Sequence, residues 1–211
     1  VIYFPGSAAL FRTNSQNFSE YYEFPVFLSF LVNNGRAVFF PVYKGTFERG
    51  VDMDVMPILS NGTNAYTDYL IQVVKDYRRS LDYLETRNDI DDQKFAFYGM
   101  SWGGWMGTII PAVEERLKAN ILLAGGMFSQ GQPEAEQINY VTRVDIPTLM
   151  LNGRYDSTRP YDTSIKPLFD LLGTPEEQKK LVVYDTDHIP PKVEYIKEIL
   201  DWLDLHLGAV N

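Results

Sequence analysis

The residues best suited to chemistry lie in the stretch 99–104, which reads Gly-Met-Ser-Trp-Gly-Gly and directly follows the apolar run 95–98. It carries the pattern Gly-x-Ser-x-Gly between a short buried strand and a helix. In that context the serine lies on a strained strand-to-helix turn, and its hydroxyl projects from the top of a sheet. Glycine suits the flanking positions because a tight turn leaves no room for a Cβ atom. Ser101 is therefore a candidate nucleophile.

A serine hydroxyl is a weak nucleophile at neutral pH and needs a general base that a carboxylate holds in place. The sequence contains two histidines. His188 lies in a loop that follows the last apolar strand, whereas His206 lies within the C-terminal helix and is expected to be structural, because that position cannot readily reach the loop edge. We therefore predict that His188 is the base.

The carboxylate should follow a strand that lies between the serine and the histidine in the chain. Asp156 meets this condition, because the segment 149–156 reads as a strand, a glycine turn and an acid. Asp162 is the main alternative, although it is expected to lie in a helix. Asp185 and Asp187 are too close to the histidine in sequence to orient its far nitrogen comfortably. Asp156 is the predicted acid.

Acyl transfer through a serine also requires backbone N–H groups aimed at the developing negative charge, the oxyanion hole. One donor should be Trp102, which follows the nucleophile and opens a helix. The other should come from the loop 5–8 after the first strand, which reads Pro-Gly-Ser-Ala. We expect the N–H of Ser7 to serve, with Ala8 as the alternative donor. A simple turn without function is the other interpretation of this loop.

The elements that must position these residues alternate between strands and helices. Six short, continuous apolar runs predict buried parallel strands: Val1–Phe4, Ala37–Val42, Phe95–Tyr98, Asn120–Ala124, Thr148–Asn152 and Leu181–Tyr184. Apolar residues at three- and four-residue steps predict helices over 66–84 and 193–207, the second with Pro190 and Pro191 in its first turn and Gly208 at its end. This order predicts an α/β fold with a mostly parallel, doubly wound sheet flanked by helices.

Two segments, 44–64 and 125–146, are longer than a simple connection requires. Both follow predicted strands, so we expect them at the carboxyl edge of the sheet, where ligands bind in open α/β folds. Their apolar residues, which include Val51, Met53 and Met56, are either loop anchors or the wall of a substrate pocket. The residues predicted to line that pocket are Tyr43, Phe47, Met127, Phe128, Tyr155 and Ile189.

Composition limits the classes of function. The 211 residues are enough for a single domain with a substantial core. The net charge of −9 disfavours nucleic acid and anionic membrane as partners. The absence of cysteine excludes a thiolate zinc site and a cysteine nucleophile, but it leaves the cellular compartment open. No apolar stretch approaches the ~20 residues needed to span a bilayer.

The segments 97–104, 152–156 and 185–188 together resemble the α/β-hydrolase superfamily, in which the triad follows the order serine, acid, histidine. The doubled glycine after Ser-Trp is most similar to the branch that holds prolyl oligopeptidase-type peptidases, acetyl xylan esterases and dienelactone hydrolases. The resemblance covers essentially the whole chain. It implies an α/β-hydrolase fold over residues 1–211.

The sequence departs from that family in two ways. The first hairpin of the fold has no counterpart before Val1, which would leave the apolar strand 37–42 at an open edge, where strands invite aggregation. We therefore expect the chain to be the C-terminal part of a longer protein. The oxyanion loop of the family often reads His-Gly, whereas residues 5–6 read Pro-Gly, which keeps the backbone donor.

These observations predict a serine esterase that acts through an acyl-enzyme on a small-molecule ester, with no metal and no cofactor. One alternative is a peptidase or amidase of the prolyl oligopeptidase type, which usually carries a large accessory domain. Another is a catalytically silent interaction domain, which is expected to have lost at least one triad residue. The sequence does not identify the acyl group, the alcohol, the oligomeric state or the localisation.

Overall fold

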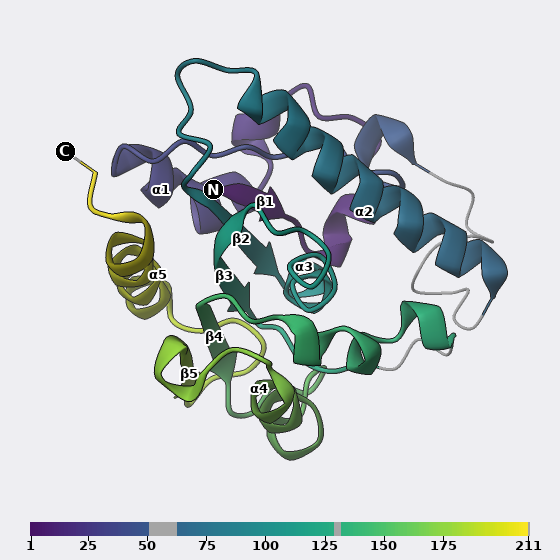
Figure 1. The fold of residues 1–211 in the computed structure, drawn as a ribbon, viewed down its shortest axis with the longest axis vertical. Coiled ribbons are helices and arrows are strands. Elements are labelled where there is room, and N and C mark those ends of the chain that lie inside the picture. The colour runs from purple at the N-terminus through teal and green to yellow at the C-terminus, as the bar shows by residue number, and fades with distance from the viewer. Residues whose placement is uncertain (51–62, 129–131, 211) are drawn as a thin grey trace.

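The computed structural model describes residues 1–50, 63–128 and 132–210. A parallel five-stranded sheet forms its centre, with the strands in spatial order from β1 to β5 (Figure 1). The strands are β1 (Ile2–Phe4), β2 (Phe95–Met100), β3 (Leu117–Leu123), β4 (Thr148–Gly153) and β5 (Lys179–Tyr184). Because all five strands are parallel, their carboxyl ends meet at one edge, which is where a ligand site forms in such sheets.

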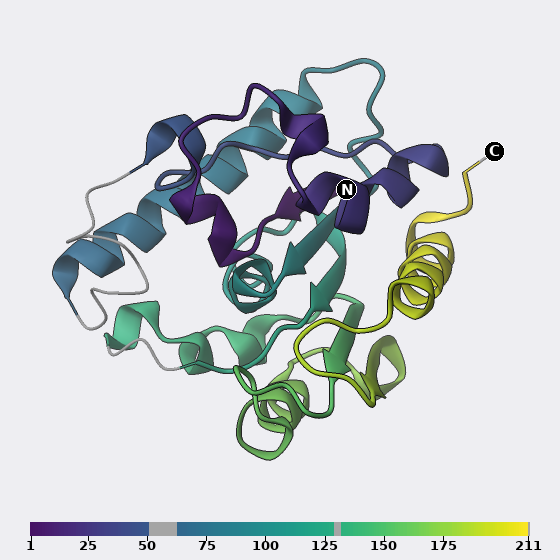
Figure 2. The ribbon, with the colours of Figure 1, turned by 180° about the vertical axis from the view of Figure 1, so that it is seen from behind.

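Helices cover both faces of this sheet, as Figures 1 and 2 show from opposite sides. The helices α2 (Asn64–Glu85), α3 (Trp102–Met106) and α4 (Lys166–Leu171) pack on one face. The helices α1 (Ser29–Asn33) and α5 (Lys192–Leu207) pack on the other. The doubly wound α/β architecture predicted from the sequence is confirmed.

Shorter helical turns form much of the connecting chain. The 3₁₀ turns are Ser7–Phe11, Phe18–Glu20, Phe47–Arg49, Pro133–Ala135, Gln137–Asn139, Val141–Arg143 and Glu176–Gln178. Two π-helical turns, Phe24–Leu28 and Tyr161–Ile165, lead directly into α1 and α4. The start of α5 differs from the prediction, because Pro191 is the residue that precedes the helix rather than part of its first turn. Its end is as predicted, at Gly208.

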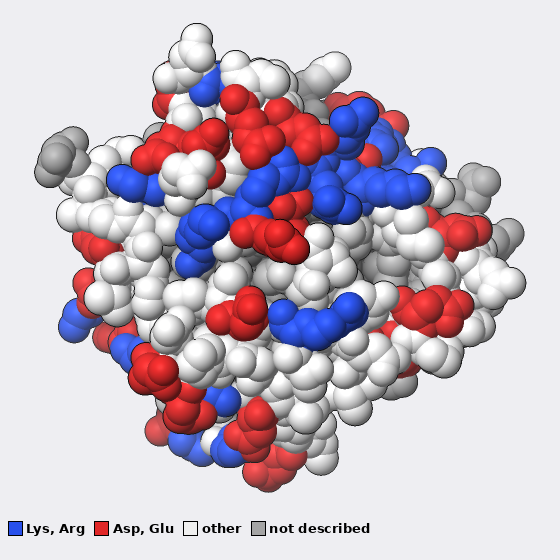
Figure 3. Space-filling model, viewed as in Figure 1, with Lys and Arg blue, Asp and Glu red and all other residues white. Residues whose placement is uncertain are grey.

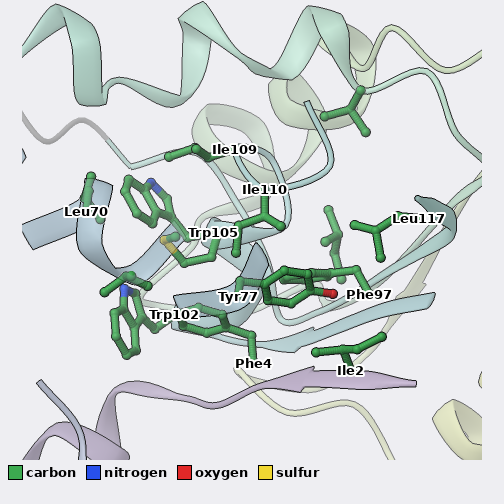
Figure 4. Packing of buried hydrophobic residues seen from close by; sticks show 14 of the residues in the cluster. Ile2, Phe4, Leu70, Tyr77, Phe97, Trp102, Trp105, Ile109, Ile110 and Leu117 are labelled. Atoms are coloured by element: carbon green, nitrogen blue, oxygen red, sulfur yellow. The ribbon is translucent and has the colours of Figure 1, made fainter. Parts of the chain in front are cut away.

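The core beneath the carboxyl edge is strongly aromatic (Figure 4). Phe4 at the end of β1 meets Trp102 edge to face, with ring centroids 4.9 Å apart. Tyr77 from the apolar stripe of α2 packs on Phe97 of β2 at 5.5 Å. Aromatic pairs of this kind add about 0.5–1.5 kcal/mol beyond the burial of their area. The end of β1, the start of α3 and the middle of α2 therefore form one packed unit below the site.

The predicted strand 37–42 is wrong as a strand. It makes a single parallel bridge, between Phe39 and Ile2 of β1. The N–H of Phe39 donates to the carbonyl of Val1, and the N–H of Tyr3 donates to the carbonyl of Phe39. Two residues later comes Pro41, which has no N–H to donate to a ladder. With β1 only three residues long, the pairing ends after one bridge.

The surface mixes both signs of charge, as the face in Figure 3 shows. Beside α2, Arg116 forms ion pairs with Asp82, Glu85 and Glu114 at 2.7–2.9 Å. The pairs with Asp82 and Glu85 are exposed and contribute little to stability, whereas the pair with Glu114 is largely buried. Among the described residues, no helix has the length and apolar character that a membrane crossing requires.

Candidate active site

Ser101 lies at the junction of β2 and α3 with a strained backbone (φ 54°, ψ −99°). This region costs a non-glycine residue about 1–3 kcal/mol, so the surroundings must hold it there. The N–H of Ser101 donates to the carbonyl of Leu123 at 2.8 Å, and the N–H of Gly103 donates to the carbonyl of Pro5 at 3.0 Å. A Cβ atom on Gly103 would lie 2.1 Å from the carbonyl oxygen of Phe4. The second glycine of the motif is thus required by the close approach of β1.

A chain of two hydrogen bonds links the serine to an imidazole and a carboxylate. Nε2 of His188 lies 2.8 Å from Oγ of Ser101, and Nδ1 lies 2.7 Å from Oδ2 of Asp156. Asp156 follows β4 and His188 follows β5, so the parallel sheet brings all three to its carboxyl edge. The N–H of Tyr155 donates to the carbonyl of Thr186 at 3.0 Å, which fastens the acid turn to the histidine loop.

The environment of Asp156 keeps it ionised. Burial raises its pKa, but hydrogen bonds from His188 and Thr158 outweigh that effect and hold the pKa below its usual value. Its Oδ1 accepts bonds from the N–H and the hydroxyl of Thr158, both at 2.8 Å, and from the N–H of Arg159 at 2.9 Å. The side chain is fully buried, so these bonds replace its water shell.

The alternative residues lie elsewhere. Asp162 is exposed on the π-helical turn 161–165. Asp185 is exposed and pairs with Arg154, while Asp187 accepts a bond from a backbone N–H of the acid turn. The second histidine, His206, packs against Trp202 on α5, with ring centroids 4.3 Å apart, and it does not line the cavity beside Ser101.

Backbone N–H groups are free where an oxyanion hole is predicted. Among the described residues, the N–H groups of Ser7, Ala8 and Trp102 donate to no protein acceptor. All three residues line the same cavity as Ser101. Ser7 and Ala8 open the turn that follows β1, and Trp102 opens α3. Ser7 and Ala8 are equally free by this criterion, so the geometry does not choose between them.

The cavity beside Ser101 has a volume of about 510 Å³ and is mainly aromatic and aliphatic. Two of the six predicted pocket residues, Phe128 and Ile189, line it. The full lining is Gly6, Ser7, Ala8, Tyr22, Phe27, Tyr66, Met100, Ser101, Trp102, Trp105, Phe128, Thr158, Arg159, His188 and Ile189. Arg159 is the one Lys or Arg in this lining, and its guanidinium carbon lies 4.9 Å from the centre of the Phe128 ring.

Two predicted pocket residues belong instead to the core. Tyr43 is fully buried, stacks on Phe4 with centroids 4.3 Å apart and donates its hydroxyl to the carbonyl of Tyr3. Phe47 is buried against Tyr21, with ring centroids 5.4 Å apart. Both rings anchor the connecting chain by packing on buried aromatic partners.

The other two also lie outside the cavity lining. Met127 packs on the core below and accepts a hydrogen bond from the hydroxyl of Ser164 through its carbonyl. Tyr155 is 64% exposed, because its backbone is tied to the histidine loop while its side chain faces solvent. The apolar residues Val51, Met53 and Met56 lie outside the described residues.

Several lining residues, among them Tyr22, Phe27, Tyr66, Thr158 and Arg159, have no counterpart in the predicted pocket. Tyr66 belongs to the apolar stripe that predicts α2, and a residue of a cavity wall and a residue of the core look alike in that pattern. Thr158 carried a usable signal, because an Asp side chain commonly accepts the backbone N–H two residues further on, as Asp156 does here. Tyr22 and Arg159 carried none. Within the described part of the chain, no three His, Asp or Glu side chains are placed to hold a metal ion.

Solved structures with the same fold cover nearly the whole chain. A cold-adapted esterase from an Arctic intertidal metagenomic library is 22% identical with a TM-score of 0.71, over 97% of this chain and 82% of that one. Acetyl xylan esterase 1 from Thermoanaerobacterium is 14% identical with a TM-score of 0.71, over 97% and 74%. Est1E from Butyrivibrio proteoclasticus, solved with ferulic acid, is 14% identical with a TM-score of 0.68, over 98% and 88%. At these identities the likeness shows the α/β-hydrolase fold.

A family assignment comes from the sequence itself. No curated protein matches the chain. Residues 28–188 match the model of the dienelactone hydrolase family, which is well over half of the chain and includes Ser101, Asp156 and His188. A dienelactone is a cyclic carboxylic ester. The chain therefore belongs to the dienelactone hydrolase family of the α/β-hydrolase superfamily and is a carboxylic ester hydrolase.

Proposed function

We propose that the protein is a serine esterase that cleaves its substrate through an acyl-enzyme on Ser101. The observation that carries this proposal is the hydrogen-bonded series from Asp156 through His188 to Ser101. A carboxylate that accepts a hydrogen bond from Nδ1–H keeps the proton on Nδ1 and leaves Nε2 free to accept the serine proton, which is the arrangement a general base requires. The ionised state of Asp156 supports this tautomer.

In the first half of the reaction, His188 takes the hydroxyl proton as Ser101 attacks the ester carbonyl. The tetrahedral intermediate collapses when His188 returns that proton to the leaving alcohol, and the acyl group stays on Ser101. Water, deprotonated by His188, then attacks the acyl carbon, and His188 returns that proton to Oγ of Ser101 as the bond to the acyl group breaks and the acid is released. Each half breaks one C–O bond and forms one, and the imidazole ends in its starting state.

The negative charge of each tetrahedral intermediate is assigned to the N–H of Trp102 and to that of Ser7 or Ala8. Donors of this kind typically contribute about 10²–10³ in kcat each, because they are oriented before the charge develops. Their freedom from protein acceptors supports the assignment, since a donor already bonded to the protein would have to break that bond.

The cavity favours esters of modest size with an apolar or aromatic group. Aromatic walls at Tyr22, Tyr66 and Phe128 suit a flat acyl or alcohol group, and a volume of about 510 Å³ suits a small molecule rather than a lipid chain or a folded protein. Some structural relatives are named for acetyl xylan and one was solved with ferulic acid. Both short and aromatic acyl groups are therefore the substrates to examine first.

A series of p-nitrophenyl esters from acetate to octanoate, with methyl ferulate as an aromatic member, tests the proposal. We expect hydrolysis of the short and aromatic members, a decline with longer chains, and loss of activity in Ser101→Ala. Aminoacyl-naphthylamides serve as the amide comparison and should be cleaved far more slowly. Full ester activity in Ser101→Ala would refute the mechanism.

A further inference from the structure

Glu23 is a buried carboxyl group that the proposed reaction does not use. It is 0% exposed and directly precedes the π-helical turn 24–28. Its Oε2 accepts a hydrogen bond from the hydroxyl of Tyr3 at 3.0 Å. Its Oε1 accepts the N–H of Gly6 and the hydroxyl of Tyr22, both at 3.1 Å. Among the described residues, no Lys, Arg or His forms an ion pair with it, which is costly for a buried carboxylate.

The three donors to Glu23 belong to three parts of the site. Gly6 lies directly before Ser7 and Ala8, and all three residues line the cavity. Tyr22 forms part of the cavity wall. Tyr3 belongs to β1, the strand from which the loop departs. One carboxylate therefore connects the oxyanion loop, the aromatic wall and the sheet.

We propose that Glu23 is a positioning residue, whose carboxylate fixes the oxyanion loop 5–8 and Tyr22 in the arrangement that the reaction needs. The inference rests on the proposed function, because it assigns the loop to the oxyanion. Gly6 fits this role closely. A Cβ atom on Gly6 would lie 3.0 Å from Oε1 of Glu23 and 2.5 Å from Cε of Met100, so the backbone is in direct contact with the carboxylate.

The ionisation of Glu23 links this arrangement to pH. Burial raises its pKa to about 7, against the lowering effect of its hydrogen bonds. The groups that face it are Tyr3, Tyr21, Tyr22 and the N–H of Gly6, with Tyr98 on the neighbouring strand and Arg12 over the ring of Tyr21. The ionised group offers acceptors to all three bonded donors. Protonation turns one oxygen into a donor, so at least one of those bonds must be remade.

The form of the protein in which Glu23 is ionised should therefore be the more active one near neutral pH. The wild-type profile of kcat against pH should contain an ionisation near 7 that belongs to Glu23. Protonation of Glu23 lowers activity at acid pH, and a substitution at Glu23 removes this ionisation from the profile.

The test compares Glu23→Gln with Glu114→Gln on a short p-nitrophenyl ester. Glu114 is likewise a buried glutamate, but it pairs with Arg116 and Arg78 and does not line the cavity. In Glu23→Gln we expect kcat to fall about 10- to 100-fold, a fraction of the loss of a whole oxyanion donor, with a smaller change in KM. Its affinity for a trifluoromethyl ketone, which mimics the oxyanion, should fall in parallel, and the ionisation near 7 should vanish. Glu114→Gln should keep the kcat and the pH profile of the wild type.

Tyr22→Phe is the second variant, because Tyr22 is 40% exposed and its loss should leave the fold intact. It removes one bond that lowers the pKa of Glu23, so the ionisation near 7 should move to higher pH. The proposal is overturned if this ionisation stays in place in Tyr22→Phe. It is also overturned if Glu23→Gln folds and retains wild-type kcat and ketone affinity.

A failure of the role proposed for Glu23 can be told apart from a failure of the proposed esterase function. Labelling of Ser101 by a fluorophosphonate reports the nucleophile without reference to Glu23. If Ser101 is labelled and Glu23→Gln is unaffected, the role of Glu23 is wrong and the esterase mechanism stands. If Ser101 is never labelled in the wild type, the esterase mechanism itself fails.

Discussion

The two halves of the site are held together by different means. The half that contains Ser101, Asp156 and His188 is built at the ends of β2, β4 and β5, and its geometry follows from parallel pairing and short turns. The half that contains the loop 5–8 follows the three-residue strand β1. One backbone bond, from the N–H of Gly103 to the carbonyl of Pro5, ties it to α3, and side chains, chiefly the carboxylate of Glu23, hold the rest.

This difference affects how each half should respond to change. The strands β2 and β4 are fully buried, and the edge strand β5 pairs with β4 over six residues, so the first half is part of the global core. The second half depends on a few hydrogen bonds to one ionisable group, so pH and single substitutions can alter it without unfolding the sheet. Substitutions in the first half should abolish chemistry at all pH values, whereas those in the second should reduce it in a graded and pH-dependent way.

The largest effect is expected from Asp156→Asn in the first half. An amide cannot fix the required imidazole tautomer, so kcat should fall by about 10³–10⁴ with the fold intact. Steady-state kinetics on p-nitrophenyl acetate measure this loss. The matched variant Asp162→Asn changes an exposed carboxylate on the neighbouring turn and should keep wild-type kcat; equal losses in both variants would contradict the assignment of Asp156.

The next effect concerns stability. Because the pKa of Glu23 is raised from 4.5 to about 7 in the folded protein, the folded state binds this proton more tightly than the unfolded state does. Its contribution to the free energy of unfolding is therefore favourable below about pH 4.5 and is lost as pH rises to about 7. The loss amounts to about 3 kcal/mol at most.

Urea unfolding of the wild type and of Glu23→Gln across pH 4.5–8 measures this contribution as a difference. The variant should gain stability relative to the wild type as pH rises. Glu114→Gln should show no comparable trend in this range, because ion pairs hold the pKa of Glu114 below its usual value of 4.5, so its contribution changes only at lower pH. A difference between wild type and Glu23→Gln that does not change with pH would contradict the raised pKa.

A smaller loss is expected from Gly6→Ala in the second half. The new methyl group would lie 2.5 Å from Cε of Met100, which can move, and 3.0 Å from Oε1 of Glu23. The loop should shift, and kcat should fall about 10- to 100-fold. Gly50→Ala is the control, because its Cβ would meet a carbonyl at an ordinary 3.5 Å. Wild-type kcat in Gly6→Ala would show that the loop takes no part in the reaction.

The smallest effect is expected from Thr158→Val. The hydroxyl of Thr158 donates to Asp156 and lies 3.0 Å from Nδ1 of His188. Its loss leaves the main bond between Asp156 and His188 in place, so kcat should fall about tenfold or less. Thr158→Ser keeps the hydroxyl and should restore most of the activity. A loss as large as that of Asp156→Asn would mean that Thr158 itself is essential.

The same division explains what could be predicted from the sequence. Ser101, Asp156 and His188 each follow a strand within a few residues, so local patterns located them and the parallel fold brought them together. Glu23 lies 17 residues from Gly6 in the chain, and no local pattern connects a glutamate to a distant backbone N–H.

The pocket was harder to predict for a related reason. An aromatic residue after a strand has the same pattern whether its ring turns toward the cavity, as Phe128 does, or into the core, as Tyr43 does. The prediction of a strand over 37–42 was wrong because it rested on the apolar run alone, whereas Pro41 within that run limits strand pairing. Side-chain direction and edge pairing are decided by tertiary packing, which a single sequence does not display.

The central claim is that Ser101 is a nucleophile activated by His188, and covalent labelling tests it most directly. The protein is treated with a fluorophosphonate and examined by intact and peptide mass spectrometry. The account predicts one adduct per chain, on Ser101, absent in Ser101→Ala and formed far more slowly in His188→Ala. No adduct on Ser101, in a wild-type protein that hydrolyses esters, would contradict it.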